Sequence, residues 1–165
     1  MEPHVTIRRM ESRDIKGVVR VYEEVFDESY ISFAELEEGK ADGPQGPYEP
    51  AVVVFENELK EFLEHSEALL LVACVDRDLV GFALAELRRA RAGHIECWLH
   101  DMGVSAAWRG QGIGHALAEP LMEWGTQAGA KYFLLETGVS NDLARRMFQE
   151  LGFSALSTVF WRPVS

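Results

Sequence analysis

The residues with the clearest chemical potential form a glycine-rich segment from Val104 to His115, with the sequence VSAAWRGQGIGH. Its three glycines, at positions 110, 112 and 114, allow consecutive backbone N–H groups to point into one concavity. A helix that begins directly after them adds partial positive charge at the same place. The segment therefore predicts a cradle for phosphate groups between the end of a strand and the start of a helix.

Other known motifs of this kind do not fit. A Walker loop requires Gly-Lys followed by Ser or Thr, which is absent, and a Gly-x-Gly-x-x-Gly fingerprint that starts at Gly110 requires a glycine where His115 stands. The chain has no Gly-x-Ser-x-Gly segment, so a serine hydrolase is not supported. The five histidines lack the spacing of metal ligands, and we expect no catalytic metal.

The elements that must position this segment follow from apolar spacing. They are strands over 5–9, 69–75, 80–87, 94–104, 131–136 and 153–163, and helices over 12–26, 30–36, 51–65, 112–129 and 141–151, with Ser12 as the cap of the first helix. Gly103 within its strand indicates a bulge or a close backbone approach, and Pro120 predicts a kink in its helix. The Gly- and Pro-rich residues 39–47 predict a mobile loop.

Length and composition describe one globular domain over residues 1–165, of which 47% are apolar. Cys74 and Cys97 lie in apolar runs and are expected to be buried free thiols. No apolar run is long enough to span a bilayer, and the first residues do not form a secretion signal. We therefore expect a cytoplasmic protein without a membrane partner.

The charge is concentrated in one segment. The net charge of −11 disfavours a nucleic-acid partner, because phosphate backbones require a basic surface. Between Val21 and Glu67 there are 14 acidic residues against Lys40 and Lys60, so this segment holds the whole imbalance. A cleft lined by it would attract cationic amines. Solvated faces of amphipathic helices are the alternative interpretation, and both can hold together.

Two sets of residues resemble the GNAT superfamily of acyl-CoA-dependent N-acetyltransferases. Arg109 to Gly114 match the family's R/Q-x-x-G-x-G/A signature. Leu135-Glu136, followed by Asn141, Ala144, Phe148 and Gly152-Phe153, is similar to a second block of the family with one change. The order of elements resembles the family over nearly the whole chain. The resemblance implies an α/β (α+β) fold, with a mixed, largely antiparallel central sheet flanked by helices and splayed at the strand that precedes the signature.

The resemblance also implies acetyl-CoA as the co-substrate and a position for each of its parts. The strand end would pair with the pantetheine arm, the signature would hold the pyrophosphate, and the second block would contact the arm and the thiol. The residues concerned are Met102, Gly103 and Val104, then Arg109, Gly110, Gln111, Gly112, Ile113, Gly114 and His115, then Asn141, Ala144 and Phe148. The N–H of Val104 would be the oxyanion donor. A plain helix cap is the alternative role for Asn141.

Phe148 stands where the family has a tyrosine that assists the leaving thiolate. A thiol has a pKa of about 8.5, so the thiolate leaves without an acid and the reaction is slowed rather than prevented. A water or Ser140 would substitute for the missing hydroxyl. The alternative function is a non-catalytic acyl-CoA-binding module that regulates a partner, and a plain interaction domain is a third hypothesis.

The expected reaction is acetyl transfer to a primary amine by direct attack in a ternary complex. Such an amine, with a pKa of about 10.4, must first lose a proton. The family's glutamate on the strand before the signature aligns with Trp98, a candidate wall of the acceptor pocket. Glu96 and His100 share its side of the strand and are the favoured bases, whereas Asp101 lies on the other side unless a bulge turns it. The acceptor is expected to be a cationic small molecule or a peptide amine, and the resemblance implies a homodimer.

Overall fold

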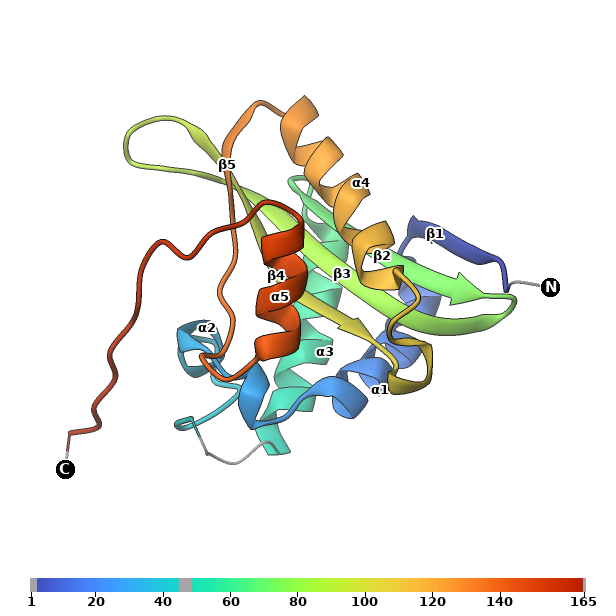
Figure 1. Cartoon of the computed structure of the whole chain (residues 1–165), viewed down its shortest axis with the longest axis horizontal. Helices are drawn as coiled ribbons and strands as arrows, with labels where there is room; N and C mark the ends of the chain where they lie inside the picture. Colours follow the sequence, from blue (N-terminus) through green and yellow to red (C-terminus); the bar gives the residue numbers. More distant parts are fainter. Residues whose placement is uncertain (1–2, 45–48, 165) are drawn as a thin grey trace.

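The computed structural model describes residues 3–44 and 49–164 and contains a five-stranded sheet (Figure 1). The strands are β1 (Val5–Arg9), β2 (Ala68–Val75), β3 (Asp78–Arg89), β4 (Ile95–Val104) and β5 (Ala130–Leu134), in that spatial order. β1 to β4 pair antiparallel, and β5 pairs parallel with β4. The expected fold class, a mixed and largely antiparallel sheet with flanking helices, is confirmed.

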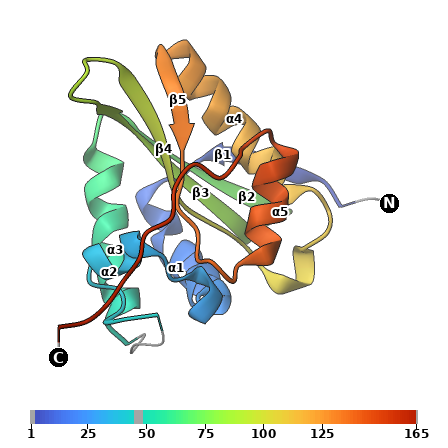
Figure 2. The ribbon, with the colours of Figure 1, turned by 60° about the vertical axis from the view of Figure 1, so that its left-hand side comes forward.

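Helices cover both faces of this sheet (Figure 2). They are α1 (Ile15–Val25), α2 (Phe33–Glu37), α3 (Glu49–Glu64), α4 (Ile113–Gln127) and α5 (Asp142–Glu150), with 3-10 turns at Ser12–Asp14, Glu28–Tyr30 and Ala106–Trp108. β2 and β3 are almost continuously apolar because both faces are buried, one under α1 and α3 and the other under α4. In the described part of the chain no helix is long and apolar enough to cross a membrane.

The pairing between strands β4 and β5 ends midway along β4. Their pairing runs only from Ile95 to Trp98 on β4, so within the described residues the rest of β4 has no paired strand on that side. On its other side β4 carries one extra residue between Leu99 and Met102, opposite Ala83–Ala85 of β3. The bulge expected near Gly103 is thus present just before it, and the sheet is open where the glycine-rich segment begins.

Three expectations about local structure are wrong. Ser12 does not cap the first helix, since a 3-10 turn from Ser12 to Asp14 precedes α1. The predicted mobile loop at 39–47 contains a fully buried Lys40, and Ala41 is buried as well, while residues 45–47 lie outside the described residues. The buried lysine fixes the start of this segment against the core.

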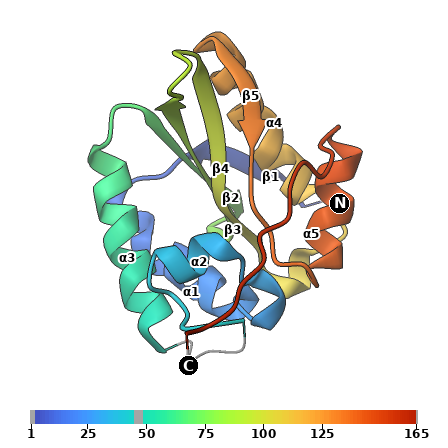
Figure 3. The ribbon, with the colours of Figure 1, turned by 90° about the vertical axis from the view of Figure 1, so that its left-hand side faces the viewer.

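The third error is the last strand. Residues 153–163 have strand-like alternation and composition, yet the segment leaves the sheet after α5 and pairs with no strand (Figures 1 and 3). A strand needs a neighbour to satisfy its backbone, and none is offered to this segment within the described chain. Its large apolar side chains are exposed as a result; they are Leu156, Val159, Phe160, Trp161 and Val164.

The remaining sequence expectations concern single residues. α4 continues through Pro120, which removes one backbone hydrogen bond from the helix. Cys74 and Cys97 are both free thiols. Cys97 is fully buried, and burial raises the pKa of its thiol to about 11, whereas Cys74 is only partly buried.

Candidate active site

The open edge of β4 offers two backbone donors. Ser105 N donates to Val80 O on β3 at 2.8 Å, so these two residues form a hydrogen-bonded pair. In an antiparallel ladder the intervening residues turn their N–H groups the other way. The N–H groups of Met102 and Val104 therefore face the opening between β4 and β5, at a spacing that an extended amide chain can match.

The glycine-rich turn lies directly beyond this edge. Gly110 and Gly112 have positive φ angles of 77° and 78°, and Gly112 caps the N-terminus of α4. A Cβ on either glycine would meet no atom within 4 Å, so the turn is open to solvent. Among the described residues no acceptor receives the N–H groups of residues 110–115. Free donors at a helix N-terminus fit the pyrophosphate of a CoA molecule.

Two further contacts fix the geometry of this cradle. Gly114 lies against α5, where a Cβ would come within 2.6 Å of Met147 Sδ. Glu24, at the end of α1, accepts hydrogen bonds from Ala106 N (2.6 Å) and Ser105 Oγ (2.8 Å), and these bonds lower its pKa. The turn between β4 and α4 is thereby attached to the helices on the opposite face. Sequence reasoning missed Glu24, because its partner lies about 80 residues further along the chain.

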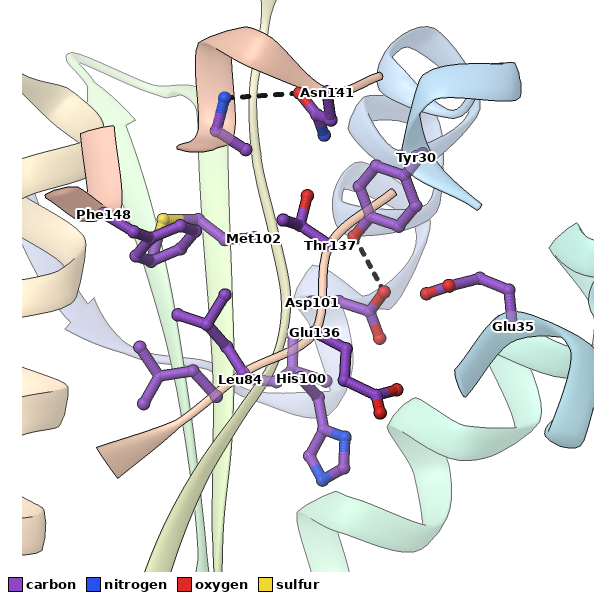
Figure 4. Close-up of a pocket in the computed structure, with 13 residues that line it drawn as sticks. Tyr30, Glu35, Leu84, His100, Asp101, Met102, Glu136, Thr137, Asn141 and Phe148 are labelled. Atoms are coloured by element: carbon purple, nitrogen blue, oxygen red, sulfur yellow. Dashed lines mark hydrogen bonds between the residues drawn. The ribbon is translucent and has the colours of Figure 1, made fainter. Parts of the chain in front are cut away.

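A first cavity, here called the α5 hollow, occupies the opening between β4 and α5 (Figure 4). It encloses about 50 Å³ and is lined by Tyr30, Glu35, Leu84, Leu99, His100, Asp101, Met102, Leu135, Glu136, Thr137, Asn141, Ala144 and Phe148. Asn141 caps α5 through a hydrogen bond from Ala144 N to its Oδ1 (3.2 Å), and the residue also borders the hollow. Both of its proposed roles are therefore geometrically compatible.

The α5 hollow brings together most of the residues that were expected to contact the pantetheine arm and the thiol of CoA. Phe148 packs edge-on against Phe153 at 5.5 Å between ring centroids and reaches the hollow beside Met102 (Figure 4). Ser140, the expected substitute for a tyrosine hydroxyl, does not line the hollow. The hydroxyls that do are those of Tyr30 and Thr137.

A second cavity, the α2 hollow, lies on the other side of His100 and Asp101. It encloses about 260 Å³ and is lined by Phe33, Ala34, Glu35, Glu37, Glu38, Arg88, Trp98, Leu99, His100, Asp101 and Glu136. Five of these are carboxylates, and two are basic. Trp98 forms part of the wall, and Arg88 lies over its ring at 5.2 Å. The two hollows share five residues, so they meet.

The bulge in β4 brings consecutive residues to the junction of the hollows. His100 and Asp101 line both cavities, although strict alternation would place them on opposite faces. Asp101 is only 4% exposed and accepts a hydrogen bond from Tyr30 Oη (2.8 Å). The pKa of Tyr30 is raised well above its usual value, first by burial and then by the charge of Asp101.

His100 is held by a partner on β3. Its Nε2 lies 2.8 Å from Glu86 Oε1, and its ring packs at a tilt against that of Phe62 on α3, with 5.4 Å between the ring centroids. The hydrogen bond from His100, against the effect of burial, lowers the pKa of Glu86 to about 2. Glu96, the other favoured base, borders neither hollow. Its carboxylate accepts a hydrogen bond from Trp98 Nε1 (2.9 Å) instead.

A buried ammonium group, that of Lys40, forms an ion pair with Asp101 at the junction of the two hollows. Lys40 Nζ is fully buried and forms ion pairs with Glu58 (2.7 Å), Glu38 (2.8 Å) and Asp101 (3.4 Å). It also lies over the ring of Phe55 at 5.4 Å. Burial opposes its charge, but the three carboxylates outweigh that effect and raise the pKa of Lys40. The segment that follows α2 is thus tied to both α3 and β4.

Several site residues were not found by sequence reasoning. The residues of this kind that line the hollows or anchor their walls are Tyr30, Glu35, Lys40 and Thr137, and Glu136 was singled out only as part of the second family block. The acidic segment from Val21 to Glu67 was the one signal that pointed to this region, and it did not single out any residue. The described residues contain no group of three or more His, Cys, Asp or Glu that could hold a metal ion.

Comparison with known proteins identifies the family. The family model of the GNAT acetyltransferases matches residues 20–153. The aminoglycoside N(6')-acetyltransferase type 1 of Stenotrophomonas maltophilia is 27% identical over 113 residues, which is 63% of this chain and 71% of that protein. An uncharacterized N-acetyltransferase of Archaeoglobus fulgidus is 28% identical over 152 residues, 86% of this chain and 88% of that protein.

The same fold is found in solved structures. The aminoglycoside N-acetyltransferase AAC(6')-Iy, solved in complex with CoA, superposes with a TM-score of 0.73 at 20% identity, over 99% of this chain and 97% of that one. The fold, the glycine-rich cradle and the family match together define an acyltransferase. The chain belongs to the GNAT acetyltransferase family. It is an N-acetyltransferase that takes its acyl group from acyl-CoA and transfers it to an amine.

Proposed function

We propose that this enzyme transfers an acetyl group from acetyl-CoA to a primary amine of a cationic small molecule, by direct attack in a ternary complex. The observation that carries the proposal is the acidic lining of the α2 hollow, which meets the α5 hollow at His100 and Asp101. The five carboxylates are Glu35, Glu37, Glu38, Asp101 and Glu136. An acceptor with several ammonium groups is complementary to this lining.

The co-substrate supplies an activated acetyl group, and the chain's own residues bind and orient it. The N–H groups of residues 110–115 would hold the pyrophosphate, and those of Met102 and Val104 would bind the pantetheine arm at the open edge of β4. The N–H of Val104 would stabilise the thioester oxygen as it gains negative charge. Asn141 and Phe148 would border the arm and the sulfur.

The nature of the acceptor is supported by two independent observations. The curated relative from Stenotrophomonas maltophilia carries the name of an aminoglycoside acetyltransferase, and aminoglycosides are small molecules with several amines. In this chain the acidic α2 hollow has room for only part of such a molecule, at about 260 Å³. The remainder of the acceptor would extend toward α2, where Glu37 is exposed.

The test is a panel of acceptors assayed by release of the CoA thiol. We expect turnover with an aminoglycoside or a linear polyamine, and much weaker turnover with a neutral monoamine. Raising the salt concentration from about 0.05 to about 0.5 M should raise the acceptor KM several-fold with little change in kcat, because salt screens the attraction. A salt-independent KM would contradict a cationic acceptor. Turnover with a lysine-containing peptide alone would assign the site to peptide amines.

The single-domain organisation, the cytoplasmic location and the homodimer remain part of this proposal. The exposed tail supports the dimer. Residues 153–164 carry strand-forming apolar side chains without a partner strand in the described chain, and β5 is an edge strand whose outer side is unpaired there. In a symmetric dimer, the tail of each copy can pair as an added strand with the unpaired edge of β5 in the other copy, so that the backbone hydrogen bonds of both are satisfied.

A further inference from the structure

The meeting point of the two hollows is where the chemistry must occur. In the proposed ternary complex the amine nitrogen approaches the thioester carbon to about 3 Å, so the group that takes the amine's proton must be reachable from both sides. Five residues line both hollows; they are Glu35, Leu99, His100, Asp101 and Glu136. Four of the five are titratable, and the contacts of each decide which is free to accept a proton.

Asp101 is already engaged through both carboxylate oxygens. Its Oδ1 accepts the hydrogen bond from Tyr30 Oη at 2.8 Å, and its Oδ2 lies 3.4 Å from Lys40 Nζ. With one partner on each oxygen, the carboxylate of Asp101 has no oxygen left without a partner that could approach the amine. Its position suits a residue that holds the wall of the site in place.

His100 and Glu136 are less suitable for different reasons. His100 Nε2 is taken up by Glu86 Oε1 at 2.8 Å. Glu136 lies in the segment after β5 and is exposed to solvent, and in the described chain it makes no hydrogen bond that would fix its orientation. A base whose carboxylate is not held in one direction contributes little to a positioned proton transfer.

Glu35 has the features that the other three lack. It is 6% exposed, and its Oε2 is fixed by hydrogen bonds from Ser32 N and Ser32 Oγ, both 2.6 Å. Its second oxygen, Oε1, has no hydrogen-bond donor among the described residues. Figure 4 shows Glu35 projecting from α2 toward Asp101, opposite the side of the hollow where Phe148 lies. Oε2 thus fixes the orientation of the carboxylate, and Oε1 is available to accept a proton.

The surroundings of Glu35 favour proton uptake. Burial raises the pKa of its carboxyl, and the negative charge of Asp101 on β4 adds to this effect against the hydrogen bonds from Ser32. His100 and Glu136 also face the junction, and Lys40 lies behind Asp101 as its ion-pair partner. A base that functions near neutral pH benefits from a pKa above the usual carboxyl range.

We propose that Glu35 is the catalytic base of the reaction, an inference that rests on the proposed function. The acceptor's ammonium group gives one proton to Glu35 Oε1. The freed lone pair forms the N–C bond to the thioester carbon, and the C–S bond breaks with its electron pair remaining on sulfur. The second nitrogen proton ends on the thiolate, so that CoA leaves as the thiol. Glu35 then releases its proton to water.

The variant Glu35→Gln separates this role from a structural one. Glutamine at this position of a capping box still accepts the hydrogen bonds from Ser32, so α2 should keep its N-terminus. We expect kcat to fall by about 10²- to 10³-fold, within the range of about 10² to 10⁴ that general acid–base catalysis supplies, with unchanged affinity for acetyl-CoA in calorimetry. Glu61→Gln is the matched control, since Glu61 is an exposed carboxylate on α3 away from both hollows, and its activity should equal that of the wild type.

A second acceptor makes the assignment sharper. Hydroxylamine is largely unprotonated at neutral pH and needs no base to expose its lone pair. Glu35→Gln should therefore approach the wild-type rate with hydroxylamine, whereas a variant that has merely displaced α2 would stay slow with every acceptor. The acidic limb of the pH profile of kcat/KM for a polyamine should also be lost in this variant.

The outcomes separate the two proposals. Glu35→Gln activity within about threefold of the wild type on polyamines, or equal losses with polyamines and hydroxylamine, would overturn the role of Glu35 and leave the proposed function intact. A wild-type protein that binds acetyl-CoA and acetylates no amine would overturn the proposed function, and with it the base that depends on it.

Discussion

At the scale of single residues, Phe148 is the departure from the family pattern with the most direct kinetic consequence. Its ring borders the α5 hollow and carries no proton for the leaving sulfur. Because a thiolate leaves readily, the missing hydroxyl should slow the reaction only modestly. We expect Phe148→Tyr to raise kcat by at most about tenfold, well below the ~10²–10⁴ that a general acid supplies to poorer leaving groups.

The control for this variant is Phe148→Leu, which removes the ring without adding a hydroxyl. Stopped-flow and steady-state rates of thiol release, with acetyl-CoA saturating, provide the measurement. A rise in kcat with tyrosine alone supports departure of the thiolate as a slow step. If kcat fell in both variants to the same extent, any change of the Phe148 side chain would disturb its packing against Phe153, and an added hydroxyl would have no link to the leaving group.

At the scale of elements, the position of α2 depends on one buried lysine. Lys40 Nζ is paired with three carboxylates contributed by three different parts of the chain, Glu38, Glu58 and Asp101. Lys40→Met would leave the buried Asp101 and the half-buried Glu38 and Glu58 without a cation. We expect a loss of about 3–5 kcal/mol in the free energy of unfolding, measured by urea denaturation, because removing one partner of a buried pair leaves the other uncompensated.

The exposed Lys60 is the matched control for this experiment. It forms a single ion pair with Glu56 one helical turn away, at 4.0 Å, and both side chains are largely solvated. Lys60→Met should change the free energy of unfolding by about 0.5 kcal/mol or less. A Lys40→Met protein as stable as Lys60→Met would show that the buried pairs do not anchor α2.

Much of the arrangement of strands and helices could be predicted from the sequence, because it depends on local periodicity. The alternation in β1, the hairpin of β2 and β3 and the glycine spacing before α4 each specify their element within a few neighbouring residues. The order of elements then places the opening beside β4. For the same reason Val104 ends β4, and Asn141 and Phe148 border the α5 hollow.

The other site residues depend on contacts that local patterns do not contain. Lys40 is buried because carboxylates about 20 and 60 residues away approach it, whereas a lysine in a Gly- and Pro-rich stretch is ordinarily solvated. The hydrophobic periodicity of the sequence assigns Glu35 to the solvent-exposed face of a short helix. Asp101 is an intermediate case: the sequence names it as a candidate on condition of a bulge, and it faces the site because a bulge in β4 shifts the alternation.

At the scale of the whole molecule, the tail after α5 is the feature least compatible with an isolated chain. Leu156, Phe160 and Val164 are each more than four-fifths exposed. Exposed, strand-prone apolar residues of this kind generally mark an interface. We expect light scattering to give the mass of a dimer for the full chain and of a monomer for a chain that ends at residue 153.

A polar variant tests the same point without a truncation. Leu156→Lys together with Phe160→Lys keeps the chain length and changes only exposed positions, so the fold of the monomer should be retained. Loss of the dimer with unchanged circular dichroism is the expected result. A full-length protein that stays monomeric at all concentrations would contradict the tail-mediated dimer.

The measurement that tests the central claim most directly is calorimetric titration of acetyl-CoA into the wild-type protein and into Gly112→Glu. Gly112 caps α4 with a φ of 78°, and a carboxylate there would repel the pyrophosphate. Gly129→Glu is the matched control, with a φ of 84° and equal open space at the far end of α4. We predict micromolar binding to the wild type and to Gly129→Glu, and none to Gly112→Glu. Absence of binding to the wild type, or equal binding to all three, would contradict a CoA cradle at this turn.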